Sequence, residues 1–109
     1  MTEKEIYKTL KDVKLPVAYD HFEEGKAPEL PYMVYRYPHT NNFAADGKVQ
    51  ARINALDIEL YTDFKDLAAE KRIEAVLDRL GVFYEKTETF ITSENMYQIL
   101  YETEVLING

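Results

Sequence analysis

Residues 56–81 read LDIELYTDFKDLAAEKRIEAVLDRLG, and this stretch contains the two patterns that decide the fold. In its first part apolar and acidic residues alternate, which predicts a strand over residues 51–61 with one buried face. In its second part apolar residues recur at helical spacing; they are Leu67, Ile73, Val76, Leu77 and Leu80. Asp63 (or Thr62) is placed to cap this helix, and Gly81 to end it.

A second, shorter helix is predicted at the start of the chain. Thr2 and Glu5 have the spacing of a capping box. Apolar residues follow at helical spacing; they are Ile6, Leu10 and Val13. Pro16 disfavours helical geometry in the residue before it, so this helix should end by about Lys14. An amphipathic helix of this length is stable only when it packs on another element.

The remaining segments are rich in β-branched and aromatic residues and predict strands. Their ranges are residues 17–22, 32–37, 82–91 and 96–107, with a Gly- and Pro-containing loop at 23–31 and a turn at 92–95. The resulting order is α-β-β-β-α-β-β. This order predicts a single α+β domain over residues 1–109, with a mainly antiparallel sheet of about five strands and two helices on one face.

Acidic residues recur on the sheet face that the helices leave uncovered; they are Asp57, Glu59, Glu102 and Glu104. Like charges on neighbouring strands repel, so they need water, a basic partner, or a basic residue of the chain such as Arg36, Arg52 or Lys86. A solvated face is the ordinary interpretation. The functional alternative is that this face lines a channel or an interface.

The charge balance argues against tight binding to nucleic acid. The chain has 13 Lys and Arg against 20 Asp and Glu, a net charge of -7. Binding phosphates requires a basic surplus, whereas an acidic surface lets DNA pass without binding it. There is no cysteine, and no apolar run approaches the roughly 20 residues needed to span a membrane.

Residues suited to catalysis are sparse, and they favour neither an active site nor a metal or cofactor site. Ser93 falls in a predicted turn, and His39 opens a polar segment. His21 follows Asp20, a pair that could in principle form a general base. The two histidines lack the spacing of metal ligands. We therefore expect no catalytic activity and no cofactor, with an enzyme using Asp20 and His21 as a weak alternative.

The segment 39–50 is the candidate interface. As a polar loop of about a dozen residues it is longer than an ordinary hairpin connection of about two to five. Phe43 lies near its middle, preceded by Asn41 and Asn42 and followed by the turn residues Asp46 and Gly47. An apolar anchor in a polar loop can dock on a neighbouring subunit. Alternatively, Phe43 folds back on its own sheet.

Three stretches resemble a family of small phage and prophage proteins, the tail terminator (tail-completion, head–tail joining) proteins of long-tailed phages. They are ELPYMVYRYPHTNNFAADGKVQ, IELYTDFKDLAAEKRIEAVLD and SENMYQILYETEVLI, and the resemblance runs from about residue 15 to the end. It implies a subunit that forms a ring, typically a hexamer, on the last ring of the tail tube, although the isolated subunit can be monomeric. Its partners would be the major tail tube protein and the head connector or completion protein, with DNA passing through.

The same resemblance implies a place in the virion at the head–tail junction, after synthesis in the host cytoplasm. It also implies that the long loop contacts a subunit or the tube, and we carry this expectation onto Asn41, Asn42, Phe43 and Asp46. Two alternatives remain: another head–tail joining subunit, or an acidic monomeric module that acts as an inhibitor or DNA mimic.

Overall fold

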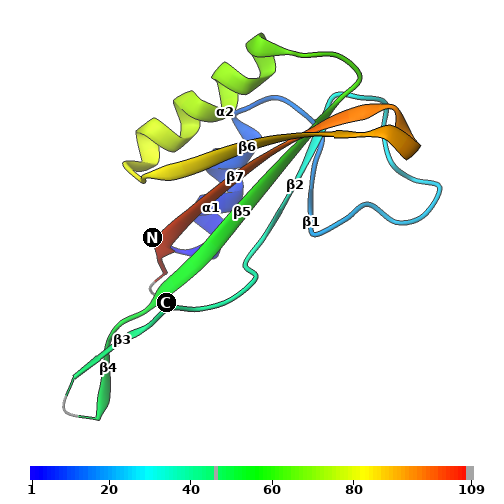
Figure 1. The fold of residues 1–109 in the computed structure, drawn as a ribbon. Helices are drawn as coiled ribbons and strands as arrows, with labels where there is room; N and C mark the ends of the chain where they lie inside the picture. Colours follow the sequence, from blue (N-terminus) through cyan, green and yellow to red (C-terminus); the bar gives the residue numbers. More distant parts are fainter. Residues whose placement is uncertain (46, 108–109) are drawn as a thin grey trace.

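A computed structural model describes residues 1–45 and 47–107 of the chain, apart from the side chains of residues 43–45 and 48–51. Two helices form one layer, a five-stranded sheet forms the second, and a short hairpin projects beyond them (Figure 1). In chain order the elements are α1 (Glu3–Lys11), β1 (Val17–Tyr19), β2 (Tyr32–Arg36), β3 (Phe43–Ala45), β4 (Lys48–Ala51), β5 (Ile53–Thr62), α2 (Leu67–Leu80), β6 (Tyr84–Ile91), the 3₁₀ turn η1 (Thr92–Glu94) and β7 (Met96–Leu106).

The sheet has the strand order β1-β2-β5-β7-β6. β5 pairs antiparallel with β2 on one side and with β7 on the other, and β6 pairs antiparallel with β7. β1 runs parallel to β2, so the sheet is mixed. The predicted α+β class, the order of elements and the mainly antiparallel five-stranded sheet are confirmed. The prediction did not include β3 and β4, which form a separate two-stranded sheet.

The first strand is shorter than the predicted range of 17–22. It ends at Tyr19, because Asp20 has a left-handed backbone with φ of 66°. The backbone N–H of Asp20 donates to the carbonyl oxygen of Tyr35 at 2.7 Å, which fastens the turn to β2. The chain then leaves the sheet and returns through the predicted loop to β2, a connection that parallel strands require.

α1 forms as predicted. The Thr2 hydroxyl accepts from the N–H of Glu5, and the Glu5 carboxylate accepts from the N–H of Thr2, each at 3.1 Å. The helix ends at Lys11 with Asp12 as its C-cap. Ile6 and Leu10 are fully buried against the sheet, and this packing stabilises a helix that is too short to persist alone.

The N-terminus of α2 differs from the prediction. Asp66 caps the helix, because its side chain accepts from the N–H of Ala69 at 3.0 Å, whereas Thr62 still belongs to β5. The expected cap at Asp63 or Thr62 is therefore wrong by about one turn. Leu67 consequently falls in the first turn and is 57% exposed instead of joining the buried stripe. Gly81 ends the helix with a left-handed backbone, as predicted.

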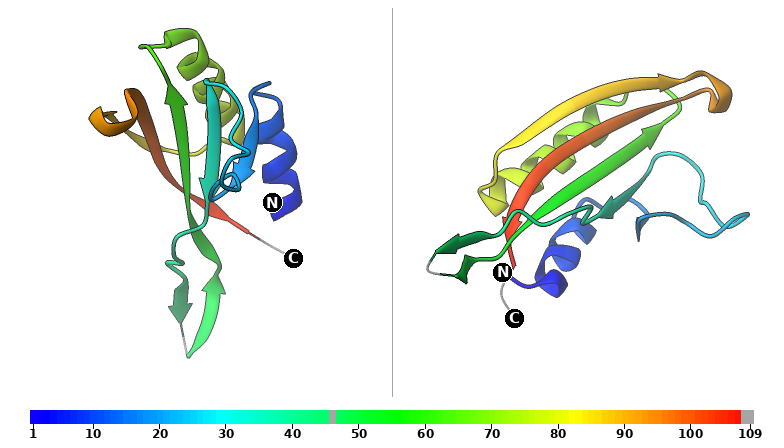
Figure 2. Two further views of the ribbon diagram at one scale, coloured as in Figure 1. Left: turned by 90° about the vertical axis from the view of Figure 1, so that its right-hand side faces the viewer. Right: turned by 60° about the horizontal axis from the view of Figure 1, so that its bottom comes forward.

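The core lies between the helices and the inner face of the sheet. Figure 2 shows both helices against one side of the sheet. Alternate residues of β5 and β7 point toward them, which is the register that the apolar pattern requires. The fully or almost fully buried core side chains include Ile6, Leu10, Met33, Leu56, Ile58, Leu60, Ile73, Leu77, Ile99 and Tyr101.

A buried carboxylate also joins α2 to the sheet. Glu70 is 1% exposed. Lys65 Nζ lies 2.8 Å from one of its oxygens, and Lys86 Nζ lies 2.6 Å from the other. Lys86 also contacts Glu74 at 2.7 Å, and the same Glu74 oxygen accepts from the Tyr101 hydroxyl at 2.7 Å. Charge pairing therefore reinforces the apolar contact between α2 and the β6–β7 pair.

The pKa shifts of this cluster define the pH range in which it stabilises the fold. Burial alone raises the pKa of Glu70, but hydrogen bonds from Lys65 and Lys86 outweigh burial and bring it below the ordinary 4.5. The hydrogen bond to Glu70 raises the pKa of Lys65. The contribution of Glu70 is therefore present above its unfolded pKa and is lost as pH falls through its lower folded pKa.

Glu70→Gln should lower the free energy of unfolding at pH 7 by about 1.5–3 kcal/mol, the range for hydrogen bonds to charged groups. Denaturant unfolding followed by circular dichroism measures this. The variant should also lose less stability than the wild type between about pH 5 and pH 3, because the carboxylate that titrates is gone. The matched control is Glu88→Gln, which breaks the 43%-exposed pair with Lys65 and should cost less than about 1 kcal/mol. Equal losses in the two variants would contradict the role of Glu70.

Candidate assembly surfaces

The segment predicted as a long polar loop is largely a hairpin, so the loop prediction is corrected. β3 and β4 pair antiparallel, with Phe43 opposite Ala51 and Ala45 opposite Lys48. Gly47 at the tip has a φ of 72°, which suits a hairpin turn. We call β3, Gly47 and β4 the arm. Figure 1 shows the arm projecting from the end of the sheet in line with β5.

The structure places three of the four predicted loop residues. Asn41 and Asn42 lie at the base of the arm, Phe43 begins β3, and Asp46 lies outside the described residues. The Asn42 side-chain oxygen accepts from the N–H of Ile53 at 3.0 Å, and the N–H of Asn41 donates to the carbonyl oxygen of Ile53 at 2.8 Å. Both asparagines therefore anchor the arm to the start of β5.

Carboxylates line up across three strands on the outer face of the sheet. Asp57 of β5 lies opposite Glu102 of β7, and Glu102 lies opposite Glu85 of β6. We call these three residues the acidic row. Neighbouring strands lie about 4.8 Å apart, so the row spans roughly 10 Å. Arg36 of β2 extends the row, with its Nε 3.7 Å from Asp57 Oδ2.

The other two predicted acidic residues flank the row. Glu104 lies opposite Ala55 and accepts from the Asn41 side chain at 3.3 Å, which joins the acidic face to the base of the arm. Glu59 accepts from the Tyr61 hydroxyl at 3.0 Å. Burial raises the pKa of Tyr61 to about 12, so this hydroxyl remains a donor at neutral pH.

Sequence reasoning missed Glu85 and misplaced Lys86. Lys86 lies on the helix side of the sheet, where it contacts Glu70 and Glu74, so it does not balance the outer face. Side chains alternate along a strand, so Glu85 must then point outward. The pairing of Glu85 with Glu102 depends on the register of β6 against β7. Residue spacing within one strand does not reveal this register.

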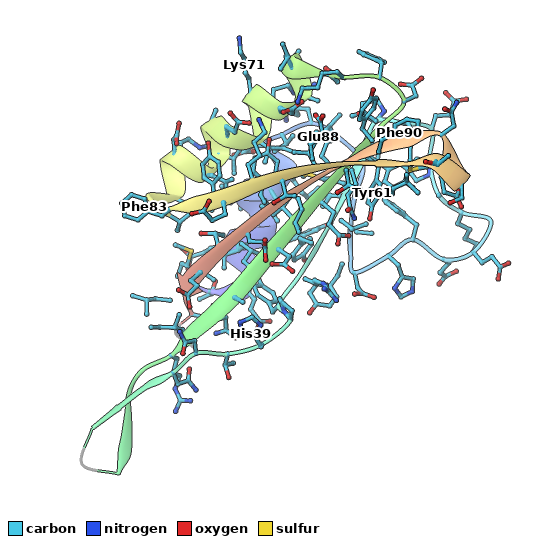
Figure 3. The ribbon with its side chains drawn as sticks, viewed as in Figure 1. His39, Tyr61, Lys71, Phe83, Glu88 and Phe90 are labelled. Carbon is cyan, nitrogen blue, oxygen red and sulfur yellow. The ribbon has the colours of Figure 1, made fainter. Side chains whose placement is uncertain are left out.

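A groove of about 430 Å³ lies over the acidic row. His39, Ala55 and Phe83 help to line it, along with all three residues of the row. Phe83 is 99% exposed; Figure 3 shows it just before β6, with β7 and β5 between it and His39. A fully exposed aromatic ring beside a groove is typical of a protein interface.

The residues considered for catalysis lie apart. His21 Nδ1 is 2.9 Å from Asp20 Oδ2, but the side chains are 71% and 49% exposed. The pair follows β1 at one edge of the sheet, whereas Ser93 lies in η1 beside β6 at the other edge. Over residues 1–45 and 47–107, no group of His, Asp and Glu is arranged to hold a metal ion. In the same part of the chain, no helix is long and apolar enough to cross a membrane.

These features define a small two-layer α+β protein with an arm and an acidic face. The chain matches no protein-family model and no curated protein. Its fold is similar to that of a chain from a solved structure described as the virion of a native gene transfer agent particle. The TM-score is 0.69 at 16% identity, over 95% of this chain and 92% of the other. The two chains therefore share a fold along nearly their whole length.

Glu102→Gln should raise the free energy of unfolding by about 0.2–1 kcal/mol, because it removes the central charge from between Asp57 and Glu85. The gain should shrink as salt is added, since salt screens exposed charges. Thermal or denaturant unfolding at low and high ionic strength measures both effects. Glu94→Gln, in the β6–β7 turn, is the control and should change stability by less than about 0.5 kcal/mol. A destabilised E102Q protein would mean that Glu102 makes a favourable contact instead.

Proposed function

We propose that this protein is a structural subunit of a phage-like virion. The observation that carries the proposal is its structural similarity to a chain of the gene transfer agent virion particle, which extends over almost all of both chains. A fold alone does not establish a role. The arm and the groove with its exposed Phe83 add surfaces that suit assembly with other proteins.

Within that class, the proposed role is that of a tail terminator, which caps the tail tube and joins it to the head connector. The protein would form a ring, a hexamer by the family resemblance, on the last ring of the tube protein. Ring formation by identical subunits requires two different surfaces on each subunit. The arm with Asn41, Asn42, Phe43 and Asp46 supplies one candidate surface, and the outer sheet face supplies another.

The acidic face suits the passage of DNA through such a ring. Those of Asp57, Glu59, Glu102 and Glu104 that a subunit contact leaves uncovered would repel phosphates, so DNA could slide by without being held. The proposed role involves no catalysis and no cofactor. The exposed Asp20–His21 pair and the distant Ser93 support that part of the proposal.

Phe43→Ala should weaken or abolish the docking of the arm on its partner and thereby prevent normal termination of tails. The experiment is complementation of a phage or prophage that lacks this gene, with electron microscopy of the lysate. The expected result is tails of abnormal length together with heads that lack tails, because an interface aromatic anchor typically costs more than about 1–2 kcal/mol when truncated.

The matched control is Phe64→Ala, which truncates a 58%-exposed phenylalanine away from the arm and should complement normally. Normal tails with Phe43→Ala would contradict the role that we propose for the arm. A gene whose complete loss leaves tails and heads joined as in the wild type would overturn the virion role itself.

A second candidate is a monomeric acidic module that binds a basic protein as an inhibitor or DNA mimic. The acidic row beneath an open groove favours this alternative. Such a module would remain monomeric and would bind its basic partner with an affinity that falls steeply with salt. Its gene could be deleted without changing particle structure, which separates the two candidates.

A further inference from the structure

α1 carries a row of basic side chains on its solvent face. Lys4, Lys8 and Lys11 are exposed and are separated by four and three residues, so they lie along one side of the helix. Ile6 and Leu10 are buried on the other side. We call the three residues the lysine stripe. In the described part of the chain, no ion pair joins these lysines to an acidic residue.

The lysine stripe and the acidic row lie on opposite sides of the molecule. α1 packs on the inner face of the sheet, and the row is on the outer face. Both Figure 2 views show α1 to one side of the strands. One chain therefore cannot bring its own stripe and row together, but two chains can.

The exposed carboxylates of the outer face are comparable in extent to the lysine stripe. Lys4 and Lys11 are seven residues apart, which is roughly 10.5 Å along a helix. Asp57 is 8% exposed and pairs with Arg36, so the carboxylates that a partner can reach are Glu85, Glu102 and Glu104. Glu85 lies one strand spacing, roughly 4.8 Å, from Glu102, and Glu104 lies two residues, roughly 7 Å, along β7. Three positive charges on one chain can thus face three negative charges on another.

We propose that the lysine stripe of one copy docks on the exposed carboxylates Glu85, Glu102 and Glu104 of a second copy. The exposed ring of Phe83 beside the groove supplies apolar area next to the charges, and Tyr7, 38% exposed on α1, can cover it. The contact is head-to-tail, because it uses a different surface on each copy. Repeated contacts of this kind close into a ring when the rotation between copies allows it, so the closed form of the assembly rests on the proposed function.

Charge reversal of either surface should abolish self-association. One variant carries Lys4→Glu, Lys8→Glu and Lys11→Glu; the other carries Glu85→Lys, Glu102→Lys and Glu104→Lys. Each places like charges against each other, which should weaken association by roughly a hundredfold or more. Sedimentation velocity of the full chain at low salt measures this. The changed residues are exposed, and circular dichroism checks that each variant is folded.

The decisive step is to mix the two variants in equal amounts. The reversed stripe of the first then faces the reversed row of the second, and the unchanged surfaces also match. The mixture should regain wild-type association with alternating copies, and association should weaken as salt is raised. A control that changes Glu23, Glu24 and Glu29 to Lys in the loop before β2 makes the same change in net charge as the variant with Glu85, Glu102 and Glu104 changed to Lys, and should associate as the wild type does.

Association that survives either charge reversal, or that the mixture does not restore, overturns this contact. A wild-type chain that stays monomeric at millimolar concentration and low salt also overturns it. Neither result decides the virion role, because a tail tube can assemble monomeric subunits through the arm. Capture of a basic peptide by the acidic row of a chain that never self-associates would favour the binding-module alternative.

Discussion

β5 pairs with β7 along its whole length, from Ile53 opposite Leu106 to Thr62 opposite Tyr97. This ladder sets the register that directs Leu56, Ile58 and Leu60 into the core and Asp57 and Glu59 outward. A shift by one residue would exchange these two sets, which burial of the inner face forbids. The position of the acidic face is thus a direct consequence of how the core packs.

The two faces of the sheet differ in whether their acidic residues are paired with basic ones. On the inner face Glu70 is buried and each of its oxygens lies within ion-pair distance of a lysine, so its charge is balanced within the chain. On the outer face Asp57, Glu102 and Glu85 are adjacent, with Arg36 as the neighbouring cation. Adjacent carboxylates reduce stability. A surface that retains them suits a function outside the fold, which we propose is assembly.

Much of the fold could be predicted from local patterns. The period of apolar residues located α1, α2 and the five strands of the sheet, and the capping box at Thr2 was visible as a sequence spacing. The cap of α2 was missed because Thr62, Asp63 and Asp66 are all acceptable caps. The choice among them depends on where β5 ends, which its pairing with β7 determines.

The candidate surfaces were harder to predict because they depend on contacts between strands. Asp57, Glu59, Glu102 and Glu104 could be assigned to one face from alternation alone. Glu85 joins them only through the register of β6 on β7, and the exposure of Phe83 depends on where α2 ends relative to β6. The arm was mistaken for a loop because its strands are short and its pairing is local to residues 43–51.

The arm and the central strand are one nearly continuous stretch of chain, from β4 through Arg52 into β5. A pull on the arm along its length is therefore transmitted straight into the middle of the sheet. There it acts parallel to the strands, and the hydrogen bonds to β2 and to β7 resist it together instead of opening one at a time. The arm has only two strands, but its connection to β5 allows it to transmit force into the body of the protein.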